Sequence, residues 1–136
     1  MKPLLSRFSL SLAALLVSFG LLAGCESAAS RVLNLTMADH GRAVSVNKGE
    51  PIQIVLEGNP TTGFTWLVDD LDPKIIAASG TPTYAPSSDG LGGGGKFTLN
   101  FVAIEHGQTN MRIIYIRPSE RGLAPEKTFA IMITVD

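Results

Sequence analysis

From residue 32 to the end of the chain, apolar residues recur at every second position rather than at every third or fourth. The alternation is clearest in segments 51–57, 97–104 and 111–116. Successive side chains of a β-strand point to opposite faces, so a period of two predicts strands with one buried face. Several short strands separated by turn residues, without a convincing long helix, predict a single all-β domain, either a sandwich or a barrel.

The same alternation predicts the positions of the strands along the chain. We expect strands at 32–37, near 44–46, and at 51–57, 64–68, 97–104, 111–116 and 129–135. Trp66, the only tryptophan, stands in the middle of one of these strands and is expected in the core. Segment 71–76 is ambiguous. Pro73 is compatible with a single helical turn there, which would lead into a strand near 77–84.

The N-terminal residues have the pattern of a secretory signal rather than of a folded domain. Lys2 and Arg7 flank the start of a short apolar run, 8–22, which ends in Leu22-Ala23-Gly24-Cys25. A positive start, a short apolar core and small residues at its end are typical of a signal peptide, and the run is short for a membrane span. The end of the run is similar to a bacterial lipobox, in which the cysteine is lipidated. An ordinary signal peptide with an incidental cysteine is the alternative.

This interpretation divides the chain into three parts. Residues 1–24 are expected to form a lipoprotein signal peptide, 25–31 the lipidated Cys25 and a short tether, and 32–136 the domain. The protein would then be anchored by lipid to a membrane of the cell envelope, facing the periplasm or the exterior. A formal net charge of −1 provides no basic surface for nucleic acid.

The chemistry of an enzyme is missing from the sequence. His40 and His106 each precede a glycine in a predicted turn, where a solvated side chain is the expected state. The aspartates of 69–72 lack the spacing of a calcium loop. Residues 90–96 match the start of a phosphate-binding loop, but Phe97 replaces the required Ser or Thr and a strand follows instead of a helix. No catalytic residue, metal site or cofactor is predicted.

Three loops have unusual compositions: the first loop, 59–63, the second loop, 86–95, and the third loop, 117–125. In the first, Pro60 fixes its own φ, two β-branched threonines follow, and Gly63 can adopt a positive φ. The second contains a run of glycines, and the third contains prolines and a glycine. Loops of this kind, held by a rigid β scaffold, are typical of a binding protein.

The motifs in these loops resemble those of the chagasin-like inhibitors of papain-type cysteine proteases. Asn59-Pro60-Thr61-Thr62-Gly63-Phe64 matches the family's first motif in full. Residues 92–95 match its Gly-x-Gly-Gly motif, and Arg117-Pro118 matches the start of its Arg-Pro-Trp motif. The resemblance covers roughly residues 44–135. It implies an immunoglobulin-like β-sandwich of about seven or eight strands, with the three loops together at one end.

The resemblance also implies a function and a set of contact residues. The family inhibits papain-like cysteine endopeptidases reversibly and without a covalent bond, by inserting the three loops into the active-site cleft. We therefore expect a monomer with a protease as its partner and no cofactor. The residues expected to contact the protease are Asn59, Pro60, Thr61, Thr62, Gly63, Gly92, Gly94, Gly95, Arg117 and Pro118.

Ser119 departs from the family pattern, which has an aromatic residue at this position. Aromatic anchors buried at an interface often contribute about 2 kcal/mol or more, so the serine predicts weaker binding without a change of fold. The departure also keeps a second hypothesis open. The chain could be a lipid-anchored structural or adhesive immunoglobulin-like domain of the envelope, with no protease target.

Overall fold

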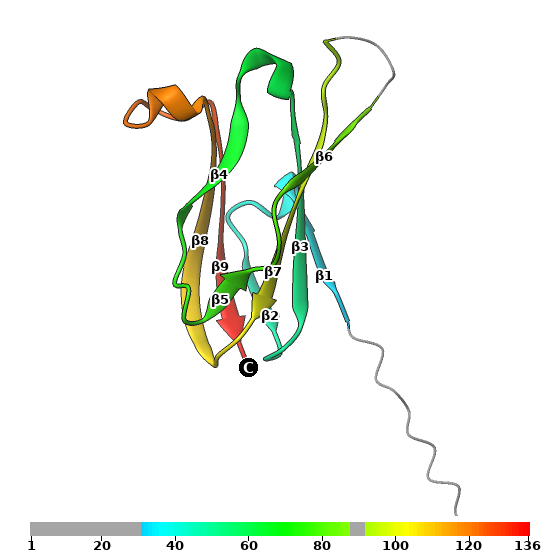
Figure 1. The fold of residues 1–136 in the computed structure, drawn as a ribbon. Helices are drawn as coiled ribbons and strands as arrows, with labels where there is room; N and C mark the ends of the chain where they lie inside the picture. Colours follow the sequence, from blue (N-terminus) through cyan, green and yellow to red (C-terminus); the bar gives the residue numbers. More distant parts are fainter. Residues whose placement is uncertain (1–30, 88–91) are drawn as a thin grey trace, which may run out of the picture.

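The computed structural model describes residues 31–87 and 92–136; the predicted signal peptide, Cys25 and nearly all of the tether lie outside this part of the chain. Two β-sheets face each other across one core (Figure 1). The nine strands are β1 (Leu33–Thr36), β2 (Ala43–Val46), β3 (Pro51–Gly58), β4 (Thr65–Asp70), β5 (Ile76–Ala78), β6 (Thr83–Pro86), β7 (Gly95–Ala103), β8 (Gly107–Ile116) and β9 (Lys127–Val135). Three short 3-10 turns are η1 (Met37–Asp39), η2 (Pro60–Thr62) and η3 (Pro118–Glu120).

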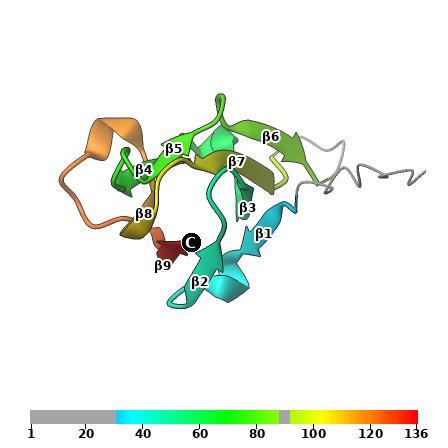
Figure 2. The same ribbon diagram turned by 90° about the horizontal axis from the view of Figure 1, so that it is seen from below.

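The strands form a sandwich, as the sequence predicted, although there are nine of them rather than seven or eight. One sheet has the order β1-β3-β7-β5, with β6 also paired to β7, and the other has the order β2-β9-β8-β4. The pairs β1–β3 and β2–β9 are parallel, and the remaining pairs are antiparallel. Figure 2 shows the two layers from the end of the sandwich at which the chain terminates.

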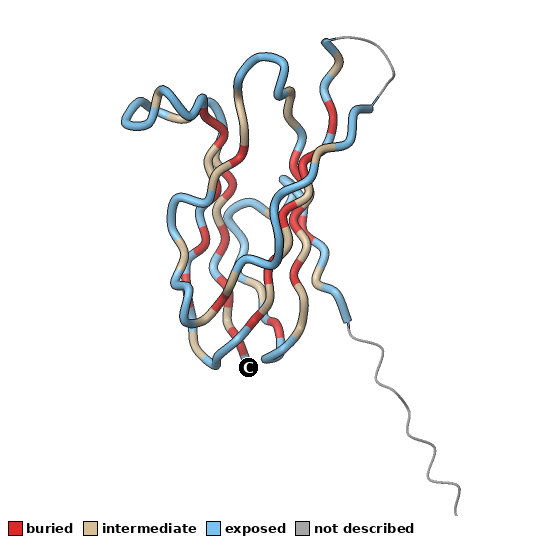
Figure 3. The backbone as a smooth tube through the Cα atoms, in the orientation of Figure 1, coloured by how far each residue is buried: buried red, intermediate tan, exposed pale blue. Residues whose placement is uncertain are grey.

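The core consists of the alternating apolar residues of both sheets. Along the strands, buried positions alternate with less buried ones (Figure 3), which confirms the predicted period of two. Trp66 is 1% exposed, and its indole nitrogen donates a hydrogen bond to Glu57 O at 3.2 Å. The central strands bury Ile52, Ile54, Leu56, Leu99, Phe101, Met111, Ile113, Tyr115, Phe129, Ile131 and Ile133. Burial of each such aliphatic or aromatic side chain contributes about 1.5–3 kcal/mol, which explains how the domain can be stable without a disulfide.

Two strands, β1 and β4, have bounds that differ from the expected 32–37 and 64–68, and each has one residue more exposed than the alternation indicated. β1 stops at Thr36, because the Thr36 hydroxyl and the Asp39 carboxylate cap η1 reciprocally. Met37 is therefore 38% exposed instead of facing the core. In β4, which begins at Thr65, the pairing register shifts after Val68, and this side chain is 43% exposed.

The ambiguous segment 71–84 contains a turn and two short strands instead of one strand. The backbone N–H groups of Ile75 and Ile76 both donate to Asp72 O at 3.1 Å, which forms a single helical turn. Gly80, with φ +79°, then separates β5 from β6. The two strands pair with different halves of β7, so neither extends over the whole of 77–84.

The described parts of the three loops of unusual composition lie together at one end of the sandwich, which we call the loop end (top of Figure 1). The first connects β3 to β4, the second connects β6 to β7, and the third connects β8 to β9. The first described residues and the C-terminus lie at the opposite end. Within residues 31–87 and 92–136, no helix has the length and apolar character needed to span a membrane.

We predict that the core and outer faces of β9 respond differently to truncation. Phe129 is 0% exposed and Met132, on the same strand, is 41% exposed. Phe129→Ala should lower the free energy of unfolding by about 3–5 kcal/mol, since it leaves a cavity between the sheets. Met132→Ala should change it by less than about 0.5 kcal/mol. Urea unfolding of both variants provides the measurement, and equal effects would contradict the assignment of the core.

Candidate functional site

The first loop is a single closed turn made by its own side chains. Asn59 caps η2, with its Oδ1 accepting hydrogen bonds from Thr61 N at 3.1 Å and from Thr61 Oγ1 at 2.6 Å. The hydroxyl of Thr62 donates to Asn59 O at 2.6 Å. Gly63 ends the turn with φ +81° and donates its N–H to Pro60 O at 3.0 Å. Each residue of the motif therefore has a defined part in one local structure.

A buried tyrosine holds this turn on the sandwich. The Tyr115 hydroxyl on β8 accepts the Asn59 N–H at 2.6 Å and lies 3.3 Å from Asn59 O, to which it can donate. Tyr115 is 5% exposed. Its ring stacks on Phe64 at a centroid distance of 5.2 Å and packs at a tilt against Trp66 at 5.0 Å. Gly58 leaves room for the ring, because a Cβ at this position would lie 2.9 Å from it.

The alternation in segment 111–116 is compatible with a buried Tyr115, but the sequence alone did not identify this residue as part of the site. A signal was present, because a buried tyrosine needs a partner for its hydroxyl, and this one comes two residues before the third loop. The partner itself was hidden, since Asn59 is 56 residues away in the chain.

The second loop is tied to the first through the same asparagine. Asn59 Nδ2 donates to Gly92 O at 3.0 Å. Gly92 and Gly94 are exposed, as expected for contact residues, and Gly92 has φ +86°. Gly95 is buried at the start of β7, where a Cβ would overlap the carbonyl oxygen of Ala85. The structure thus gives Gly95 a packing role, and its contact with a protease stays a prediction.

The third loop is tied to the first by Arg117. Its Nε donates to Thr62 O at 3.2 Å, its guanidinium carbon lies 4.4 Å from the centre of the Phe64 ring, and its Nη1 lies 3.3 Å from Glu120 Oε1. We expected Arg117 to contact a partner, and its side chain is exposed enough to do so. The structure adds an intramolecular role, since Arg117 joins the first loop to the third.

The loop end brings the ten predicted contact residues together in one region. Pro60, Thr61, Thr62, Gly63, Gly92, Gly94, Arg117 and Pro118 are exposed, whereas Asn59 is half-buried and Gly95 is buried. The exposed members present backbone and small side chains, with one charged group. Such a surface suits insertion into a narrow cleft, because little side-chain freedom is lost on binding.

The titratable residues that the structure describes lie mostly away from the loop end. No group of three or more His, Cys, Asp or Glu that could hold a metal occurs in the described part of the chain. His40, predicted as a solvated turn residue, is exposed, and its Nδ1 accepts a hydrogen bond from Ala130 N at 3.0 Å. Hydrogen bonds from Lys48 lower the pKa of Glu105, but this pair lies in the turns at the opposite end.

We predict that the hydroxyl of Tyr115 is required to order the first loop. Tyr115→Phe leaves the Asn59 N–H without a partner, so it should lower the stability by about 1–3 kcal/mol and accelerate hydrogen exchange of the Asn59 amide. Tyr84→Phe is the matched control, because this hydroxyl is 3.5 Å from Gly93 O and has no contact with Asn59. NMR-detected exchange measures both variants. Equal protection of the Asn59 amide in the parent and in Tyr115→Phe would refute the role of the Tyr115 hydroxyl in ordering the first loop.

Comparisons with known proteins agree with this geometry. The chain is 29% identical over 106 residues to amoebiasin-1 of Entamoeba histolytica, which covers 76% of this chain and 99% of that protein. Chagasin of Trypanosoma cruzi is 28% identical over 88 residues, covering 62% of this chain and 80% of chagasin.

The fold is also similar to solved structures. The cysteine protease inhibitor EhICP2 of Entamoeba histolytica has a TM-score of 0.68 at 21% identity, covering 77% of this chain and 96% of that chain. PbICP-C, in its complex with falcipain-2, has a TM-score of 0.51 at 19% identity, and the match covers 79% of this chain and 92% of PbICP-C. The family described as chagasin family peptidase inhibitor I42 matches residues 45–133, which include all three loops. The chain therefore belongs to the chagasin family of peptidase inhibitors.

Proposed function

We propose that this protein is a reversible, non-covalent inhibitor of papain-like cysteine endopeptidases, acting as a monomer whose three loops occlude the active-site cleft. The observation that carries the proposal is the closed first loop. The side chain of Asn59 caps this loop, and the Tyr115 hydroxyl accepts a hydrogen bond from the Asn59 N–H. Two proteins of similar fold agree with it: EhICP2 is a cysteine protease inhibitor, and PbICP-C forms a complex with falcipain-2.

The internal hydrogen bonds explain how the first loop could fill a cleft without being cleaved. A peptide bond is hydrolysed only if its carbonyl oxygen can move into the oxyanion hole as the thiolate attacks. The carbonyl oxygens of Asn59, Pro60 and Thr62 all accept hydrogen bonds from within the protein. Attack on the carbonyl carbon would have to move an oxygen that is already held by an internal hydrogen bond, so binding without reaction is favoured.

The loop end supports a division of roles among the predicted contact residues. The exposed residues Pro60, Thr61, Thr62, Gly63, Gly92, Gly94, Arg117 and Pro118 are positioned to touch the enzyme. Asn59 and Gly95 are less accessible and position the loops. The family consists of peptidase inhibitors, and the proposed activity requires no catalytic group of this chain.

We predict that Gly63→Glu abolishes inhibition. The larger, charged side chain would project from the tip of the first loop at a position where φ is +81°. Gly80→Glu is a matched control, because Gly80 has φ +79°, has open space around it and lies in the turn between β5 and β6. Both variants carry a similar backbone strain. A Cβ at residue 63 would meet the Arg117 side chain only at an ordinary contact distance of 3.8 Å, so contact with the enzyme is the main expected difference between them. The measurement is the inhibition constant against papain.

The same assay distinguishes the two hypotheses that the sequence left open. An inhibitor should act on papain or a related enzyme, lose this activity in Gly63→Glu and keep it in Gly80→Glu. A structural or adhesive envelope domain should not inhibit at all. Absence of inhibition by the parent domain at high micromolar concentration across several papain-like enzymes would refute the proposed function.

We further propose that residues 1–24 are a signal peptide and that lipid on Cys25 anchors the protein in the cell envelope. The sequence around Cys25 and the position of the first described residues support this arrangement. A tether at that end would direct the loop end away from the membrane (Figure 1). The loops would then be free to meet a protease.

Replacement of the cysteine tests the anchor. Cys25→Ser should move the protein from the membrane fraction to the soluble fraction, because the thiol that carries the lipid is lost. Ser27→Ala, two residues away, should remain in the membrane fraction. Retention of Cys25→Ser in the carbonate-washed membrane fraction would contradict the lipid anchor.

A further inference from the structure

The third loop carries an exposed leucine that no motif accounts for. Leu123 is 66% exposed, whereas the other exposed large hydrophobic residues in the described part of the chain are 38–43% exposed. A single exposed apolar side chain is common on protein surfaces and does not by itself indicate a site. Whether Leu123 could bind a partner depends on how its backbone is held, which residues surround it and how close it lies to the other loops.

The backbone around Leu123 is ordered rather than free. Glu120 N donates to Arg117 O at 2.8 Å to form η3, and Leu123 N donates to Glu120 O at 3.1 Å. Gly122, with φ +108°, allows the chain to turn back, and Arg121 and Leu123 form an isolated β-bridge. The side chain is therefore presented on a fixed support, which lowers the entropy lost when a partner covers it.

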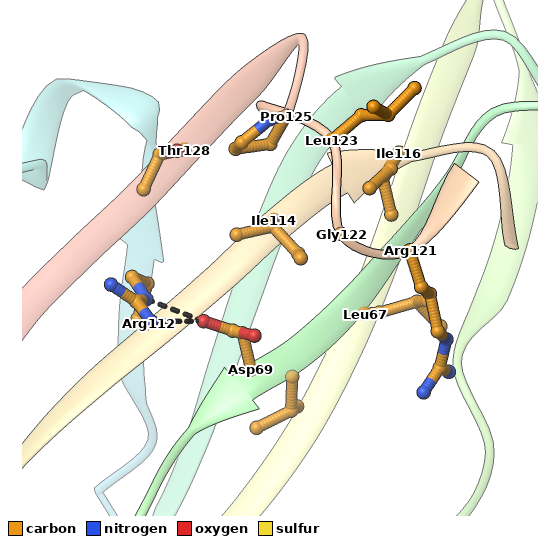
Figure 4. Close-up of a pocket in the computed structure, with 11 residues that line it drawn as sticks. Leu67, Asp69, Arg112, Ile114, Ile116, Arg121, Gly122, Leu123, Pro125 and Thr128 are labelled. Carbon is orange, nitrogen blue, oxygen red and sulfur yellow. Dashed lines mark hydrogen bonds and ion pairs between the residues drawn. The ribbon is translucent and has the colours of Figure 1, made fainter.

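Beside Leu123 is a hollow of about 510 Å³ on the outer face of β4 and β8, lined by apolar side chains together with Asp69, Arg112, Arg121 and Thr128. Leu67, Ile114 and Ile116 line it from the sheet, and Leu123 and Pro125 line it from the third loop (Figure 4). The ion pair between Asp69 and Arg112 closes its far side, with Arg112 Nε donating to Asp69 Oδ2 at 2.6 Å. Leu123 thus belongs to an apolar strip that starts in the third loop and continues onto the sheet.

The strip adjoins the proposed contact surface. Arg117 ties the third loop to Thr62 of the first loop, so both loops would reach the same enzyme. Ser119, at the position where the family has an aromatic residue, is exposed on η3 and has only a hydroxymethyl side chain. The third loop therefore lacks an apolar anchor at this position but has one four residues later.

We propose that Leu123 supplies the apolar contact of the third loop in place of an aromatic residue at position 119. Its partner is an apolar side chain on the wall of the active-site cleft of a papain-like protease. The inference rests on the proposed function. Leu123 determines specificity, since enzymes with a polar wall at this place would bind less tightly than enzymes with an apolar wall.

Inhibition constants against a panel of papain-like proteases test this role. Leu123→Ser should weaken inhibition of the best target by about tenfold or more, as expected for loss of an apolar anchor. Leu123→Met should stay within threefold of the parent, because it keeps an apolar side chain of similar size. Met132→Ser, which also replaces an exposed apolar side chain with serine but lies on the outer face of β9, should leave inhibition unchanged. All three should unfold at temperatures close to the parent, because Leu123 and Met132 are both surface residues, 66% and 41% exposed.

Two outcomes separate this proposal from the function on which it rests. If the parent inhibits, Gly63→Glu does not, and Leu123→Ser inhibits within twofold of the parent, the role of Leu123 is refuted and the proposed function stands. If the parent inhibits none of the enzymes, both are refuted. Equal weakening by Leu123→Ser and Met132→Ser would also refute the role, since the effect would then not belong to the third loop.

Discussion

The loop end depends on the hydrogen bonds between the Tyr115 hydroxyl and the backbone of Asn59. The hydroxyl fixes the place where the chain leaves β3, with the Asn59 N–H 2.6 Å away. From this fixed point, the side chain of Asn59 closes the first loop through Thr61 and reaches the second loop at Gly92. Removal of the hydroxyl would release a whole set of contacts, because one residue serves as their common support.

These contacts also join the two sheets at the loop end. The second loop connects strands of one sheet, the third loop connects strands of the other, and the first loop passes between the sheets. The hydrogen bonds from Asn59 to Gly92 and from Arg117 to Thr62 therefore close the open end of the sandwich. The described residues of the three loops thus form one connected surface, which can bind a cleft with a small loss of conformational entropy.

The family motifs combine residues that present the surface with residues that build it. Pro60 and Gly63 are exposed at the tip of the first loop. Gly95 is buried, and a Cβ there would overlap Ala85 O, so only glycine fits. Arg117 holds two loops together while its side chain remains accessible. A motif that looks like a list of contact residues in the sequence thus includes parts of the scaffold. Leu123 shows the converse, an exposed side chain in a favourable position outside every motif.

The sequence by itself determined the all-β class, most of the strands, the core position of Trp66 and the closed turn of the first loop. These features depend on alternation along a strand or on hydrogen bonds between residues two or three positions apart, such as Asn59 and Thr61. The tertiary structure alone decided the partner of Tyr115, the burial of Gly95 and the splitting of segment 77–84 into β5 and β6. Each depends on which strands pair, and so on contacts between residues far apart in the chain, which local patterns do not encode.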